Sequence, residues 1–126
     1  MTERTVRSGP ESDDVGVMLR RLSLPEHGAV ELVVGLGLIA APLLLGFGPA
    51  GLLASMAAGA ILVGLGLTEG LPISAHMTSD IAVALGLMAV SVALAGGGER
   101  AAGGLLAAAA ASELALSLGT RWTRRA

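Results

Sequence analysis

Two histidines occur in this chain of 126 residues, and each is followed four positions later by an acid. His27 precedes Glu31 and His76 precedes Asp80, so on a helix each pair shares one face, one turn apart. Imidazole and carboxylate ligands suit divalent metals such as Zn, Mn or Fe. Histidine also titrates near neutral pH and can relay protons. The spacing therefore points to a metal site or a proton site.

The two pairs belong to a predicted internal repeat with an offset of 49 residues, which carries position 27 onto 76 and position 31 onto 80. The same offset aligns Gly35-Leu36-Gly37-Leu38-Ile39-Ala40 with Ala84-Leu85-Gly86-Leu87-Met88-Ala89. We expect one transmembrane hairpin over 23–67, a hinge at 68–72 and a second hairpin over 73–119.

Four apolar stretches approach the length that crosses a bilayer, because a core of about 30 Å needs about 20 helical residues. They run over 29–48, 50–67, 73–95 and 101–119, and their formally charged residues are Glu31, Asp80 and Glu113. A soluble bundle would need polar faces, whereas 50–67 offers only Ser55. The sequence predicts an all-α membrane protein whose four transmembrane helices form two tandem hairpins.

Polar segments flank these spans. Ser23 and Glu26 form a capping-box pattern that predicts the start of the first helix. Residues 1–22 form a polar tail, in which 14–22 carries one apolar stripe, either a short interfacial helix or a linker. Residues 120–126 form a basic tail.

Arginines give the predicted orientation. Arg100 falls in a predicted loop, and the other seven flank the two ends of the chain: Arg4, Arg7, Arg20, Arg21, Arg121, Arg124 and Arg125. Four spans bring both termini to one side, so the positive-inside rule predicts that both are cytoplasmic. Trp122 suits the interfacial belt beside them. The lysine-free, Arg/Ala/Gly-rich composition is typical of a high-GC bacterium, which predicts the inner membrane.

Glu113 extends the polar set. It lies six residues before Gly119, roughly 9 Å from that end of its helix, at the same end of the bundle as both His/acid pairs. Ionisable groups in a span usually face the bundle interior and pair with something. Three interpretations stay open: helix-end electrostatics with the histidines in a wet interface, a divalent metal site, or a proton relay.

Small residues recur every four positions in two predicted spans and favour close helix packing. They are Gly51, Ser55 and Gly59 in one span, and Gly103, Ala107, Ala111 and Ala115 in the other. These stripes serve either packing inside the monomer or binding of a second copy. Pro42 predicts a kink in the first span, and its repeat counterpart is Ser91.

The stretch Ala41-Pro42-Leu43-Leu44-Leu45-Gly46-Phe47, followed by an apolar segment containing Gly59, resembles the SPW-repeat membrane proteins of bacteria. Their signature is Ser-Pro-Trp before a Gly-Phe turn. Pro42, Gly46 and Phe47 match it, while Ala41 and Leu43 stand where the family has Ser and Trp. The resemblance covers 27–67 directly and 76–119 through the repeat. It implies paired transmembrane helices and no defined activity.

Composition excludes several classes of function. With 53% apolar and 14% charged residues, the chain departs from soluble domains, which carry about 25% charged residues. It has no cysteine for disulfide or thiolate chemistry, and a net charge of −2 disfavours nucleic acid as a partner. No Walker, Gly-x-Ser-x-Gly or His-Glu-x-x-His motif occurs.

We therefore expect a small integral membrane protein with a structural or partner-binding role and no catalysis or cofactor of its own. Its predicted partners are the lipid bilayer and a second copy or another membrane protein. The alternative is a metal-binding or proton-handling protein. It would use five side chains: His27, Glu31, His76, Asp80 and Glu113.

Overall fold

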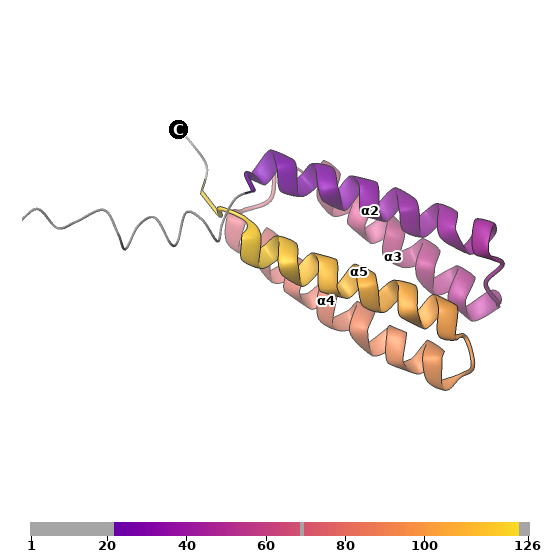
Figure 1. The fold of residues 1–126 in the computed structure, drawn as a ribbon. Coiled ribbons are helices and arrows are strands. Elements are labelled where there is room, and N and C mark those ends of the chain that lie inside the picture. Colours follow the sequence, from indigo (N-terminus) through magenta and orange to yellow (C-terminus); the bar gives the residue numbers. More distant parts are fainter. Residues whose placement is uncertain (1–21, 69, 124–126) are drawn as a thin grey trace, which may run out of the picture.

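The computed structural model describes residues 22–68 and 70–123, which form four helices (Figure 1). These are α2 (Leu24–Leu45), α3 (Pro49–Leu67), α4 (Ile73–Gly96) and α5 (Arg100–Gly119). Figure 1 shows α2 beside α3 and α4 beside α5, with the start of α2 and the end of α5 at the same end of the bundle. The all-helical prediction is confirmed for the described residues.

All four helices are long and apolar enough to cross a membrane, with mean hydropathies of 2.2, 2.0, 1.9 and 1.5 in chain order. Large apolar side chains face outward, among them Leu44 (81% exposed) and Leu118 (75% exposed). Such exposure would be costly in water and is favourable in lipid. The predicted four spans are therefore confirmed at the level of length and composition, which indicates a multi-pass membrane protein.

Local sequence sets the helix ends. The predicted capping box is present: the Ser23 hydroxyl accepts from the backbone N–H of Glu26, and the Glu26 carboxylate accepts from the backbone N–H of Ser23. α2 ends at Leu45, because Gly46 adopts a left-handed conformation with φ 67°. Arg100 is the first residue of α5, which corrects its placement in a loop.

Only the last residue of the interfacial helix predicted over 14–22 lies within the described part of the chain. That residue, Leu22, pairs with the segment after α5. Its N–H donates to the Gly119 carbonyl at 3.1 Å, and its carbonyl accepts from Arg121 N–H at 2.9 Å. The pairing holds the segment after α5 against the start of α2.

Glycines let α2 and α3 approach closely. A Cβ atom at Gly35 would lie 2.7 Å from the Gly59 carbonyl oxygen, and one at Gly59 would lie 2.5 Å from the Gly35 carbonyl oxygen. Gly51 and Ser55 are buried as well. The predicted small-residue stripe of α3 therefore packs inside the monomer.

The corresponding stripe in α5 is only partly correct. Gly103 is buried, and a Cβ atom there would lie 2.8 Å from the Ser91 carbonyl oxygen. Ala107 is half-buried, while Ala111 and Ala115 are exposed. A four-residue spacing exceeds the 3.6 residues of a helical turn, so the stripe drifts about 40° per step away from the contact face.

The buried face of α5 instead follows its own helical period. Besides Gly103, it consists of Ala102, Leu106, Ala109, Ala110, Glu113 and Leu116. Most of these small and apolar side chains join a core with residues of the other three helices, including Leu38, Leu62 and Leu87.

Pro42 lies inside α2, which continues for three more residues. Proline has no N–H, so it cannot bond the carbonyl of Leu38 four positions earlier. The Ser55 hydroxyl of α3 donates to that carbonyl at 2.6 Å and satisfies it. In the other helix pair, the Ser91 hydroxyl of α4 donates to the Gly103 carbonyl of α5, also at 2.6 Å.

One hydrogen bond joins the two helix pairs at the end that holds the α2–α3 and α4–α5 turns. The carboxylate of Glu99 accepts from the backbone N–H of Gly51 at 2.8 Å. Gly48, the N-cap of α3, has no side chain to cap the helix, so Glu99 supplies an acceptor from the neighbouring pair. At the opposite end, the two pairs meet at His27, Glu31, His76 and Asp80.

Candidate metal centre

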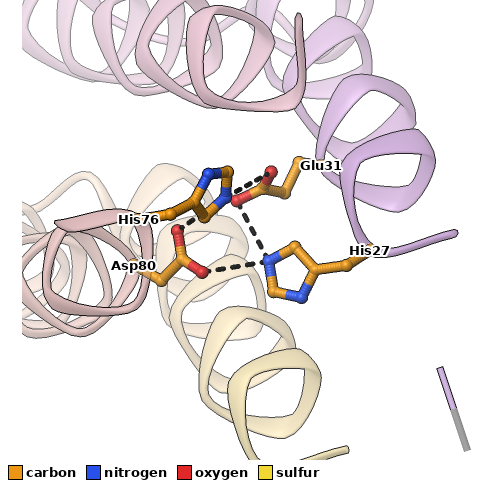
Figure 2. A group of neighbouring side chains, drawn as sticks. All are labelled: His27, Glu31, His76 and Asp80. Carbon is orange, nitrogen blue, oxygen red and sulfur yellow. Dashed lines mark ion pairs between the residues drawn. The ribbon is translucent and has the colours of Figure 1, made fainter. Parts of the chain in front are cut away.

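The first two turns of α2 and α4 place four polar side chains in one group, which we call the His/acid cluster: His27, Glu31, His76 and Asp80. Figure 2 shows the two imidazoles and two carboxylates pointing toward one another from separate helices. The side chain of His76 is 14% exposed, and the other three are at most 1% exposed. His27 therefore does not lie in a wet interface, whereas His76 is partly accessible.

Nitrogen and oxygen atoms alternate around the His/acid cluster. Nε2 of His27 lies 3.3 Å from Oε1 of Glu31 and 3.0 Å from Oδ2 of Asp80. Nε2 of His76 lies 3.5 Å from Oε2 of Glu31 and 3.5 Å from Oδ1 of Asp80. Each acid thus bridges its own helix partner and the histidine of the other helix, which joins α2 to α4.

None of these facing atoms has a hydrogen-bond partner of good geometry among the described residues. They are the Nε2 atoms of both histidines and all four carboxylate oxygens. One ligand atom from each residue can be chosen so that all four lie within 4.8 Å of one another. Buried polar atoms normally have partners, so the set has the composition and spacing to hold a cation.

Thr120, the residue after α5, determines which nitrogen of a neutral His27 carries the proton. Its hydroxyl oxygen lies 2.7 Å from Nδ1 of His27 and 2.6 Å from the carbonyl oxygen of Leu116. A hydroxyl has one proton and a carbonyl has none, so Thr120 donates to Leu116 and accepts from Nδ1–H. This hydrogen-bond network assigns the proton of a neutral His27 to Nδ1. Its Nε2 then directs a lone pair at Glu31 and Asp80.

Trp122 packs beside the His/acid cluster. Its ring centroid lies 5.2 Å from that of His27 and 6.0 Å from that of His76, and its Nε1–H donates to the Ser117 carbonyl at 3.0 Å. The sequence predicts Trp122 in the interfacial belt and gives Thr120 no role in the polar set. Their position just after the last span is the sequence feature that could have indicated a place beside the His/acid cluster.

Glu113 does not belong to the group of four. It is completely buried on the face of α5 that also holds Leu116 and Thr120, and neither carboxylate oxygen has a hydrogen-bond partner among the described residues. Thr120 and His27 are in contact and so lie at the same level of the bundle. At 1.5 Å per residue, Glu113 lies about 10 Å further into the bundle than Thr120, whereas Glu31 lies about 6 Å further than His27. The structure thus brings together four of the five predicted polar residues and places the fifth about one turn further into the bundle.

Comparisons with known proteins add no functional assignment. The chain matches no protein-family model, no curated protein and no solved structure. The resemblance to SPW-repeat proteins therefore stays a prediction.

Proposed function

We propose that this protein is a multi-pass membrane protein that binds one divalent transition-metal ion in the His/acid cluster. Two imidazole nitrogens and two carboxylates are a common ligand set for such ions. The structural or partner-binding role expected from composition is the alternative, and no catalytic step is proposed.

The unpaired lone pair of His27 carries this proposal. Nε2 of a neutral His27 faces two carboxylate oxygens at 3.3 and 3.0 Å, and all three atoms are acceptors. Buried acceptors directed at one another are costly without a positive charge between them. A cation, either a metal ion or a proton, satisfies all three atoms at once.

Six unpartnered donor atoms from four residues favour a metal ion over a single proton. In a tetrahedral site with bonds of about 2.0–2.1 Å, neighbouring ligand atoms lie about 3.3 Å apart. One atom from each of the four residues can be chosen so that all lie within 4.8 Å of one another, so the side chains would move closer together around a bound ion. The bond from Nδ1 of His27 to Thr120 adds the outer hydrogen bond that metal-binding histidines usually make.

The test is the metal content of detergent-purified protein after dialysis against a weak chelator. Wild type and Glu99→Gln should each retain close to one ion per chain, because Glu99 lies outside the His/acid cluster. His27→Ala/His76→Ala should lose it. Metal-free wild type, even after incubation with Zn²⁺, Mn²⁺ or Fe²⁺, would leave a proton in the cluster and favour the structural alternative. Equal metal in the double variant would also overturn the proposal.

The proposal also includes the internal repeat and the location of the protein in the membrane. Buried positions 31, 35, 38 and 42 of α2 correspond, at the offset of 49, to buried positions 80, 84, 87 and 91 of α4. This correspondence supports the internal repeat. The arginine distribution supports a bacterial inner-membrane location with both termini in the cytoplasm.

A further inference from the structure

A cavity of about 800 Å³ opens at the end of the bundle that holds the His/acid cluster. Its walls come from the starts of α2 and α4, the end of α3 and the segment after α5. This volume lies within the range of small-molecule sites, about 300–1,000 Å³. The cavity is therefore large enough for a ligand considerably bigger than a metal ion.

The lining of the cavity is partly apolar and partly charged or ionisable. Apolar walls come from Leu24, Leu65, Leu71 and Ile73, while Arg121 and His76 supply positive or ionisable groups. Such a combination fits a molecule that carries both a charged group and a hydrocarbon part.

Arg121 supplies a positive charge to the lining of the cavity. Its side chain forms no ion pair with the described residues. Glu26 is close enough to feel its charge, but the Glu26 carboxylate is already bonded to the backbone N–H and hydroxyl of Ser23, at 2.7 and 2.9 Å. A guanidinium is well shaped to bind phosphate or carboxylate. Among the described residues that line the cavity there is no acid, so Arg121 favours an anion as the ligand.

The start of α4 adds to the positive potential. Pro72 is its N-cap and makes no side-chain cap, whereas the start of α2 is closed by its capping box. The helix dipole favours an anion at such an end.

We propose that this cavity binds an amphiphilic anion whose head group pairs with Arg121 and whose hydrocarbon chain lies against Leu24, Leu65 and Ile73. The inference goes beyond metal binding, because Arg121 is not a member of the His/acid cluster. The ligand chemistry is a phosphate-type head group on an apolar chain. A bilayer phospholipid and a single-chain phosphate ester both provide it.

Native mass spectrometry of the full chain in a non-ionic detergent tests the proposal, with dodecyl phosphate as the probe. We expect saturable binding of one dodecyl phosphate per chain, and no comparable binding of inorganic phosphate or dodecyltrimethylammonium. The protein is first treated with a chelator, so failure of the metal proposal would not affect the result. Equal binding of dodecyltrimethylammonium would overturn the anion site.

Variants separate charge from general affinity for detergent-like molecules. Arg121→Gln should weaken dodecyl phosphate binding at least tenfold. Arg100→Gln, which removes an arginine from the start of α5 at the other end of the bundle, should leave it unchanged. Ile73→Trp, which narrows the apolar wall, should weaken it as well. Unchanged binding in Arg121→Gln with native helicity would overturn the proposal.

A competition measurement identifies the source of the ligand. Displacement of dodecyl phosphate by phosphatidylglycerol, but not by phosphatidylcholine, would assign the cavity to a membrane phospholipid. Retention against both lipids would assign it to a single-chain amphiphile. Displacement by both lipids alike would overturn the selectivity for an anion.

Discussion

The hydroxyl of Thr120 accepts a hydrogen bond of 2.7 Å from Nδ1–H of His27, although the two residues stand 93 positions apart in the chain. The bond fixes the imidazole so that Nε2 faces Glu31 and Asp80. Because Thr120 also donates to Leu116, it cannot reverse its role and become the donor to His27. The segment after α5 thus determines which nitrogen of His27 on α2 faces the two carboxylates.

Thr120→Val is expected to weaken metal binding about 10–100-fold, as loss of an outer hydrogen bond to a histidine ligand commonly does. Valine keeps the shape of the side chain and removes its acceptor, whereas Thr120→Ser keeps the acceptor and should bind like wild type. Titration with Co²⁺, followed by fluorescence of the single tryptophan 5.2 Å from His27, measures the affinity. Equal affinity in the valine and serine variants would show that the bond does not orient a ligand.

Glu113→Leu is expected to raise the free energy of unfolding by about 1–3 kcal/mol, the range associated with an unsatisfied buried polar group. Glu113 is 0% exposed and has no hydrogen-bond partner among the described residues. Unfolding in SDS, followed by circular dichroism, measures the change. Glu99→Leu should instead lower stability, because it removes the bond to Gly51. A destabilised Glu113→Leu would mean that Glu113 binds a cation or another group deep in the bundle.

Local patterns were sufficient to predict much of this structure. The apolar runs and the capping box at Ser23 are set by neighbouring residues, so four helices and the start of α2 were predictable. The spacing from His27 to Glu31 fixed a shared helix face. Parallel placement of α2 and α4 then brought this pair to its counterpart, His76 and Asp80.

Contacts between distant segments were not predictable in the same way. Thr120 and Trp122 reach His27 only because the chain after α5 pairs with Leu22. The bond from Glu99 to Gly51 depends on how one helix pair lies against the other. Glu113 was expected beside the four cluster residues, but depth along a helix cannot be compared between helices before their packing is known.

Ser55→Ala is expected to cost about 1–3 kcal/mol of stability, because it leaves the Leu38 carbonyl buried without a donor. Adding Pro42→Ala to this variant should recover part of the loss, since residue 42 then supplies its own N–H to that carbonyl. Ser112→Ala is the matched control, because that hydroxyl makes only an exposed bond within its own helix. SDS unfolding compares the four proteins. No recovery on adding Pro42→Ala would contradict the assigned role of Ser55.

Gly35→Ala is expected to destabilise the protein, whereas Gly37→Ala in the same helix should be neutral or stabilising by up to about 1 kcal/mol. A Cβ atom at position 35 would lie 2.7 Å from the Gly59 carbonyl oxygen and would force α2 away from α3. No neighbouring atom lies within 4 Å of a Cβ atom at position 37. Thermal unfolding in detergent measures both changes. Equal effects would show that α2 and α3 are not in backbone contact in the membrane.

Single-cysteine labelling tests the orientation of the four helices, since the chain contains no cysteine of its own. Ala101→Cys and Thr123→Cys both lie at exposed positions, at the two ends of α5. If α5 crosses the bilayer, a membrane-impermeant maleimide added to intact cells should label only one of them. The positive-inside rule predicts that this is position 101, because Arg121 and the other terminal arginines hold position 123 in the cytoplasm. Labelling of position 123 alone would reverse the orientation, and labelling of both positions in sealed cells would exclude α5 as a membrane span.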